Sequence, residues 1–197
     1  MDADQVTALR ILLGSSPWLQ RTRSFARTLR GCASRTAGGL LIVGTPDEEP
    51  WHLAAHLGEE SRLAGVPGLA PTLVRWAPPP GAPPHLRVGM SRLEEARRGE
   101  TLFVVSPDAA PPPLLERVHD ARRVGATILA LDQGDPELDE MAHEYLSVAA
   151  ELAPVSFSAA QHLVSAAVGE PAQGRSGVRT RLARLLDAIT GPQAGDS

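Results

Sequence analysis

The chain has 197 residues and a mass of 20.8 kDa, enough for one domain with a substantial core and too little for two domains of ordinary size. Hydrophobic residues make up 43% and charged residues 21%, which excludes disordered and fibrous proteins. The net charge of −4 is unevenly distributed along the chain. Residues 1–36 carry six arginines and two acidic residues, residues 37–170 carry nine arginines and nineteen acidic residues, and residues 171–197 carry four arginines and two acidic residues. We therefore expect an acidic centre between two basic ends.

Two residue types are missing from the chain. It contains neither lysine nor asparagine, a bias that we interpret as the mark of a GC-rich, actinomycete-like genome. The absence of lysine also excludes Schiff-base chemistry and the phosphate-binding lysine of P-loops. The single cysteine, Cys32, excludes an internal disulfide and a cysteine-based zinc cluster. With no leader-like N-terminus and no apolar run near the ~20 residues of a membrane helix, the sequence predicts a cytoplasmic protein without membrane contact.

The expected secondary structure alternates between helices and short apolar strands. Ser15-Ser16-Pro17 is typical of a helix start, and the apolar stripe that begins at Trp18 ends at Gly38-Gly39. The wholly apolar run Leu40–Val43 predicts a parallel strand buried on both faces. The later elements are expected, in chain order, at 48–64 (helix), 72–75 (strand), 78–84 (proline-rich crossing), 86–98 (helix), 101–105 (strand), 113–124 (helix), 127–131 (strand), 136–145 (helix), 147–149 (strand) and 158–168 (helix).

This alternation predicts a doubly wound α/β domain, with a five-stranded parallel sheet covered by helices on both faces. In the commonest, flavodoxin-like strand order, the first and third strands are neighbours and ligands bind beyond their carboxyl ends. The sequence therefore places a site on the loops 44–49 and 106–113. We divide the chain into an arginine-rich N-terminal helical segment (1–36), the α/β domain (37–170), and a linker with an amphipathic helix and a polar tail (171–197).

Several motifs between residues 20 and 170 resemble the sugar isomerase (SIS) domain family. The run GETLFVVSPDAAPPPLL (99–115), followed by ARRVGATILAL (121–131), is similar to the family's strand, serine-containing phosphate loop, helix and next strand. The runs WHLAAHL (51–57) and QHLVSAAV (161–168) are similar to helices of phosphoheptose isomerases. The resemblance implies a SIS fold, a sugar derivative as the small-molecule partner, and assembly as a homodimer or homotetramer.

The two loops depart from the family pattern. Ser106 keeps the serine of the phosphate loop, but Asp108 and Pro111 stand where hydroxyl residues are expected. Three consecutive prolines, 111–113, have no N–H to donate to a phosphate, and a carboxylate repels an anion. The first loop, 44–49, has lost the family's second glycine and gained three acids. We therefore expect a degenerate phosphate loop and favour a non-catalytic or regulatory protein, a pseudoenzyme that binds a sugar derivative or another small ligand.

The candidate site residues follow from these loops and helices. The ligand-binding candidates are Gly44, Thr45, Asp47, Ser106, Asp108 and Gln161. His52, His56 and Glu59 lie at i, i+4 and i+7, a spacing that lets two imidazoles share a zinc ion. If the chain is an active isomerase, the resemblance implies His52, His56 and His162 as acid and base groups. The alternative is that these are ordinary polar residues of half-exposed helices. No cofactor is expected, with zinc as the one option.

Two alternative functions remain open. One is an active phosphosugar isomerase of the phosphoheptose type, which interconverts an aldose and a ketose. The other is a protein-interaction scaffold that uses the basic N-terminal helix, since six arginines between Arg10 and Arg35 could pair with a partner's acidic surface. No aromatic residues interleave with these arginines in the manner of a nucleic-acid site, so nucleic acid is not an expected partner. The C-terminal amphipathic helix must also bury its apolar face, on the domain or on a partner.

Overall fold

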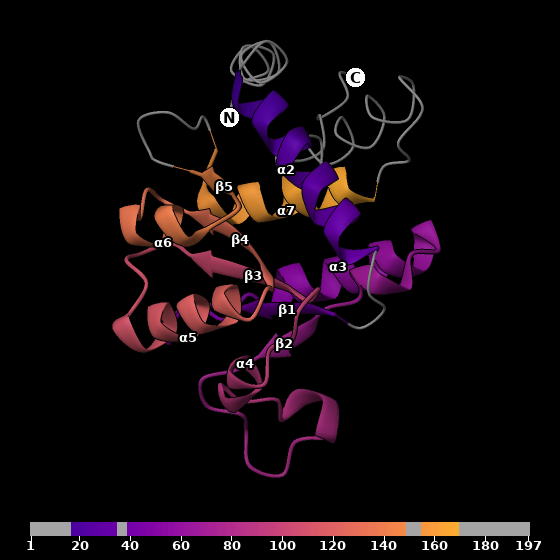
Figure 1. Ribbon diagram of the computed structural model, residues 1–197. Coiled ribbons are helices and arrows are strands. Elements are labelled where there is room, and N and C mark those ends of the chain that lie inside the picture. The colour runs from indigo at the N-terminus through magenta and orange to yellow at the C-terminus, as the bar shows by residue number, and fades with distance from the viewer. Residues whose placement is uncertain (1–16, 35–38, 149–154, 170–197) are drawn as a thin grey trace, which may run out of the picture.

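A five-stranded, all-parallel sheet forms the centre of the computed structural model, which describes residues 17–34, 39–148 and 155–169 (Figure 1). The strand order is β2-β1-β3-β4-β5, so the first and third strands are neighbours. This confirms the predicted fold class. The strands are β1 (Leu40–Val43), β2 (Thr72–Val74), β3 (Thr101–Ser106), β4 (Thr127–Asp132) and β5 (Glu144–Ser147).

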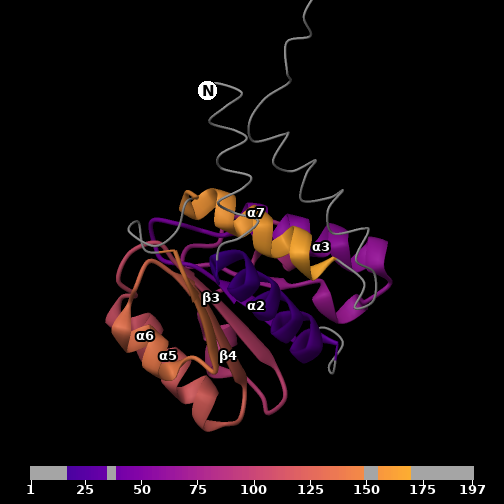
Figure 2. The ribbon, with the colours of Figure 1, turned by 90° about the horizontal axis from the view of Figure 1, so that it is seen from above.

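Helices cover both faces of the sheet. One layer holds α2, α3 and α7, and the other holds α4, α5 and α6 (Figure 2). The helices are α2 (Pro17–Ala33), α3 (Trp51–Ala64), α4 (Ser91–Glu94), α5 (Pro112–Arg123), α6 (Pro136–Met141) and α7 (Phe157–Val168), with 3₁₀ turns η1 (Pro67–Leu69) and η2 (Pro84–Leu86).

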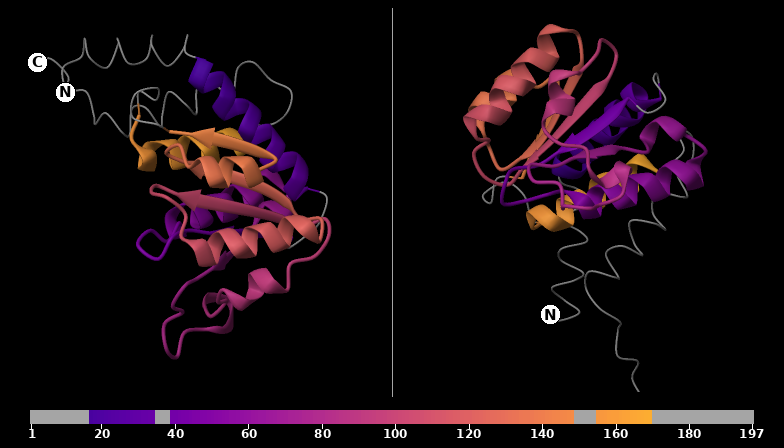
Figure 3. Two further views of the ribbon diagram at one scale, coloured as in Figure 1. Left: turned by 60° about the vertical axis from the view of Figure 1, so that its left-hand side comes forward. Right: turned by 90° about the horizontal axis from the view of Figure 1, so that it is seen from below.

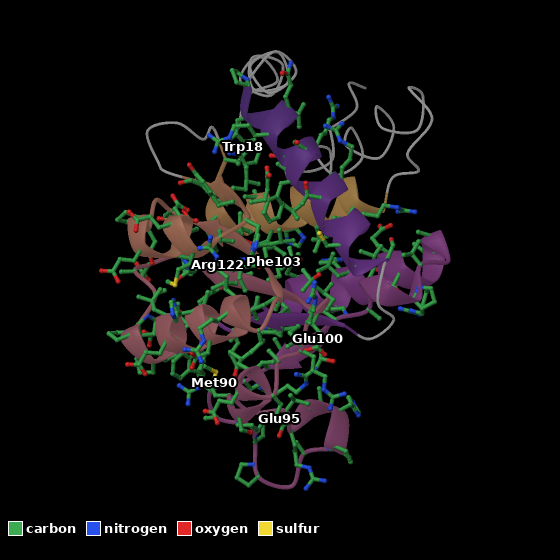
Figure 4. All side chains as sticks on the ribbon, in the orientation of Figure 1. Trp18, Met90, Glu95, Glu100, Phe103 and Arg122 are labelled. Atoms are coloured by element: carbon green, nitrogen blue, oxygen red, sulfur yellow. The ribbon has the colours of Figure 1, made fainter. Side chains whose placement is uncertain are left out.

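The apolar strands supply both halves of the core. Because successive side chains of a strand point to opposite faces, Leu40 and Ile42 pack toward α2, α3 and α7, whereas Leu41 and Val43 pack toward α5. Phe103 of β3 lies at the middle of the molecule (Figure 4). Its ring centroid is 5.5 Å from that of Phe25 on α2, in a tilted arrangement typical of favourable aromatic pairs. The N-terminal helix is therefore part of the core.

The predicted helix 86–98 is wrong. The chain there forms the turn η2 and the single helical turn α4, in a segment that projects from the body below the sheet (Figure 3). The helix does not continue because the backbone N–H of Arg97 donates to the Glu100 side chain at 2.8 Å, and Gly99 adopts a φ of +87°. Glu100 also receives the Arg92 guanidinium at 2.5 Å, so this buried carboxylate organises the turn.

Two further boundaries differ from the sequence predictions. The helix expected at 48–64 begins at Trp51, because Pro50 takes the N-cap position with a ψ of 48°, outside the helical range. The helix expected at 136–145 ends at Met141. Its last residues instead join the sheet, because His143 N–H donates to the Ile128 carbonyl and His143 Nδ1 accepts from Ile128 N–H. Strand β5 therefore begins at Glu144, three residues earlier than predicted.

Some sequence predictions concern residues that the structure does not describe. Residues 1–16 and 170–197, with the predicted amphipathic helix, and the end of the predicted strand at 149 lie outside the described residues. Within the described ranges, no helix combines the length and the apolarity needed to cross a bilayer. The arginine-rich helix α2 has an internal role, because Arg30 Nη1 donates to the Val168 carbonyl at 2.8 Å and so binds the last turn of α7.

A pair of carboxyl groups lies where β4 ends and α6 packs. Asp132 is fully buried, and its Oδ1 accepts the Gly134 N–H at 2.6 Å. In the described structure, Asp132 Oδ2 and Asp139 Oδ1 are buried without any donor. Burial raises the pKa of Asp139 to about 7, with further contributions from a hydrogen bond to Asp132 and from the negative charge of Asp132. The pair is therefore stable when it holds one proton between its carboxyl groups.

This raised pKa predicts a pH-dependent stability. The folded protein keeps the Asp139 proton up to about pH 7, whereas the unfolded chain loses it near pH 4, so the contribution of this group to the free energy of unfolding falls as the pH rises from about 4 to about 7. Asp139→Asn should remove this fall and be more stable than wild type at about pH 8, measured by urea unfolding. The control is Asp120→Asn, which removes the same charge from an exposed position of α5. An unchanged pH profile in Asp139→Asn would contradict the shared proton.

Candidate functional site

A pocket of about 580 Å³ opens at the carboxyl ends of β1 and β2. Its walls come from the β1–α3 loop, from the first turn of α3 and from the first turns of α7, with Arg75 directly after β2. Ser158, Gln161 and His162 are the contributions of α7. In parallel α/β sheets, ligands bind at this edge, because the loops that follow the strands gather there.

The β1–α3 loop (44–50) is anchored to the residues that follow β2. Arg75 makes a two-pronged ion pair with Glu49, with Nε at 3.0 Å and Nη2 at 2.5 Å from Oε2. The indole N–H of Trp76 donates to the Gly44 carbonyl at 2.8 Å, and the Thr45 hydroxyl accepts the Glu48 N–H at 3.2 Å. Hydrogen bonding to Glu49 raises the pKa of Arg75, so this pair stays charged. One side of the pocket is thereby fixed before any ligand arrives.

Gln161 is the buried polar residue of the pocket wall. Only 7% of its surface is exposed, and its side chain has no hydrogen-bond partner among the described residues. Its amide nitrogen and oxygen are not fully buried, so they reach the space of the pocket. Gln161 therefore presents a donor and an acceptor that a bound molecule can satisfy.

Three histidines gather where α3 and α7 run side by side. The rings of His56 and His162 meet edge to face with centroids 4.9 Å apart, and His52 stacks on Trp51 at 3.3 Å. Burial lowers the pKa of His162, and the nearby His56 and His52 lower it further. His162 is therefore neutral at pH 7. Among the residues that the structure describes, no three His, Cys, Asp or Glu side chains are placed to hold a metal ion, so the predicted trio with Glu59 does not form a ready zinc site.

The β3–α5 loop (107–111), which follows Ser106, is closed by internal hydrogen bonds. The buried Ser106 hydroxyl donates to the Asp108 carbonyl at 2.6 Å. The Ala110 N–H donates to the Asp135 carboxylate at 2.7 Å. The other carboxylate oxygen of Asp135 accepts the N–H groups of Glu137 and Leu138 and caps α6. The Ser106 hydroxyl and the Ala110 N–H, two groups with which such a loop could hold an anion, are thus used within the chain.

The structure brings together part of the predicted site. Of the predicted residues, the pocket wall contains Asp47, His52, Gln161 and His162. The remaining predicted residues do not line it: Gly44, Thr45, His56, Glu59, Ser106 and Asp108. Gly44 and Thr45 are buried within the β1–α3 loop, His56 contacts His162 from α3, and Asp108 is exposed on the β3–α5 loop.

Sequence reasoning missed the residues from β2 and from the start of α3. Arg75 and Trp51 line the pocket, and Trp76 holds its loop. A signal for Arg75 was present, because it ends a predicted strand that neighbours the first strand in the commonest sheet order. Trp51 had no such signal, since an aromatic residue in the first turn of a helix is as compatible with packing as with binding. In the structure its side chain is 55% exposed.

Comparison with solved structures gives the fold. No family model matches the chain, and no curated protein matches it. A protein of Silicibacter pomeroyi, provisionally assigned as a phosphosugar isomerase, matches with a TM-score of 0.54 and 16% identity over 93% of this chain. The present chain covers 52% of that protein, about half of its length. The sugar isomerase domain of an RpiR transcription factor from Sphaerobacter thermophilus matches with a TM-score of 0.50 and 16% identity, over 85% of this chain and 86% of that one.

The sheet order and the two helical layers make the chain a doubly wound α/β domain with a pocket at the carboxyl edge of its sheet. The solved structures that it matches show that this domain has the fold of a sugar isomerase domain.

The close packing at Gly44 predicts a strong substitution effect. A Cβ at Gly44 would collide with the Glu48 carbonyl and with the Pro50 ring, so Gly44→Ala must displace the β1–α3 loop. We expect the free energy of unfolding to fall by about 1–3 kcal/mol. Gly58→Ala is the matched control, because that Cβ meets nothing within 4 Å and alanine favours the helix by about 0.5–1 kcal/mol. Urea unfolding of both variants measures the difference; equal stability would contradict the close packing.

The histidine cluster predicts a titration. The ring signals of His162, followed by NMR, should titrate below the ordinary value of 6.5. His56→Gln should raise the midpoint only in part, because burial is the larger cause. His119→Gln, on an exposed position of α5, should leave it unchanged. Below about pH 6.5 the unfolded imidazole binds a proton more readily than the folded one, so this group makes the fold less stable as the pH falls. A midpoint at or above 6.5 would contradict this account.

Proposed function

We propose that this chain binds a sugar derivative in the pocket beside β1 and β2, and that it acts as a binding or regulatory domain without isomerising its ligand. The observation that carries the proposal is the Gln161 side chain, which lies in the wall of a pocket of about 580 Å³ and makes no hydrogen bond to the described residues. This volume lies within the range of about 300–1,000 Å³ that small-molecule sites occupy. The fold, which the chain shares with sugar isomerase domains, supports the sugar as the class of ligand.

The closed β3–α5 loop supports the non-catalytic half of the proposal. A phosphosugar isomerase must first hold the phosphate, and convergent N–H and hydroxyl groups do this at low energetic cost. Here the Ser106 hydroxyl and the Ala110 N–H already bond within the chain, and prolines 111–113 have no N–H. We interpret this as a degenerate phosphate loop.

An active isomerase is the second candidate, and the contact between His56 and His162 favours it. Enediol chemistry needs a base that is neutral near pH 7, and His162 fulfils this condition. His162 also lines the pocket, so it can reach a bound sugar. A turnover assay therefore belongs to the test.

Thermal unfolding with a panel of hexoses, heptoses and their phosphate esters tests binding. At ten times the dissociation constant a ligand adds about 1.4 kcal/mol, a rise in melting temperature of about 3–6 °C for a domain of this size. Gln161→Leu should abolish the rise, because it removes a hydrogen-bond donor and acceptor from the pocket wall. The control Gln20→Leu changes the same residue type at an exposed position of α2.

Two results would overturn the proposal. If no member of the panel raises the melting temperature, the pocket does not bind sugars. If NMR of the same mixtures shows an aldose converting to a ketose, and His162→Gln abolishes the conversion, the isomerase candidate is correct. Binding without conversion supports the proposal.

A further inference from the structure

The charges around the pocket do not balance. Glu49 is matched by Arg75, in an ion pair whose side chains are about four-fifths buried. Asp47 and Glu48 also line the pocket, are exposed, and have no ion-pair partner in the part of the chain that the structure describes. His162 is partly buried, and its lowered pKa leaves it neutral at pH 7. Two carboxylates therefore face any ligand without a matching cation.

The helix ends do not reverse this sign. The first turns of α3 and α7 line the pocket, and each contributes a partial positive charge of about half an elementary unit at most. Together they amount to about one positive charge against two carboxylates. Ser156 moreover caps α7 by accepting the Ala159 N–H at 3.2 Å, which uses one of the donors of that helix end. The pocket remains negative.

A phosphate group would have to displace an internal partner. Arg75 is the one arginine of the pocket wall, and three hydrogen bonds hold it on Glu49. If a phosphate took Arg75, Glu49 would become a third unmatched carboxylate beside the bound dianion. In the β3–α5 loop the Ala110 N–H is bound to Asp135 and is therefore not free for an anion.

An uncharged sugar finds suitable groups in the same wall. Its hydroxyls can donate to the carboxylates of Asp47 and Glu48, and can both donate to and accept from the Gln161 amide. Trp51 offers an indole that is 55% exposed, and the electron-rich face of such a ring attracts the C–H face of a sugar. Gln161 makes no hydrogen bond to the described residues, so its amide is available to such a ligand.

We infer that the pocket takes a carbohydrate without a phosphate group and discriminates against the phosphate ester of the same sugar. This inference rests on the proposed function and specifies its ligand class. The discrimination comes from Asp47 and Glu48, and from the cost of separating Glu49 from Arg75.

Calorimetric titration of the full chain with matched pairs tests the inference. The probes are glucose, mannose and sedoheptulose, each compared with its phosphate ester at the primary hydroxyl. At about 20 mM salt the ester should bind at least about tenfold more weakly than the free sugar, and at about 300 mM salt the gap should narrow, because salt screens exposed charges. If the esters bind as tightly as the sugars or more tightly, the inference is overturned and the proposed function stands. If no probe of either kind binds, the proposed function fails as well.

A charge-neutralising variant assigns the discrimination to residues. Asp47→Asn combined with Glu48→Gln should strengthen binding of the ester about tenfold, and change binding of the free sugar by less than about threefold, since amides also accept hydroxyl hydrogen bonds. The matched control is Asp108→Asn combined with Glu116→Gln, which removes two charges from exposed positions outside the pocket. An equal gain in the control would show that only the net charge of the protein matters, and would overturn the inference.

Discussion

The burial of β1 and of the centre of β3 on both faces is the constraint on which the rest of the structure depends. No side chain of Leu40–Val43 tolerates water, so helices must cover the sheet from both sides. Polar groups can then collect only where strands end. The pocket, the carboxyl pair of Asp132 and Asp139 and the closed β3–α5 loop all lie at the carboxyl edge of the sheet. The chemistry of the molecule is thus concentrated at one edge because its centre is apolar.

The part of the fold that could be predicted is the part set by local pattern. Short apolar runs indicated the first four strands correctly, and the commonest order of such sheets matches the order observed. The helix predicted at 86–98 followed an acceptable local pattern, but the Glu100 side chain competes for the backbone N–H of Arg97. Helix propensities do not include this competition, because it depends on the position of the Glu100 side chain in the folded structure.

The candidate site was predictable only where a loop follows a strand. Asp47 was found in this way, and Gln161 and His162 through a family resemblance. The ion pair between Glu49 and Arg75 joins residues 26 positions apart, and its formation depends on the pairing of β1 with β2. The partnerless state of Gln161, which carries the functional argument, is a property of its surroundings and has no trace in the sequence.

Four carboxylates at this edge are satisfied by four different means. Glu49 has a guanidinium, Asp139 retains a proton, Asp135 has three backbone N–H groups, and Asp47 has solvent. The choice follows from burial, because a buried charge needs a partner or must be neutralised. Only the solvated carboxylates remain free to act on a ligand.

The Asp135 carboxylate has a consequence for the loop that it closes. It belongs to the same chain as Ala110, so its effective concentration at that N–H is set by the fold and exceeds the concentration of any free metabolite. Binding of a diffusing anion costs free energy because the anion loses translational freedom, whereas this carboxylate lost that freedom when the chain folded. The Asp135 carboxylate therefore occupies the Ala110 N–H in the loop after β3, and a diffusing anion would have to displace it.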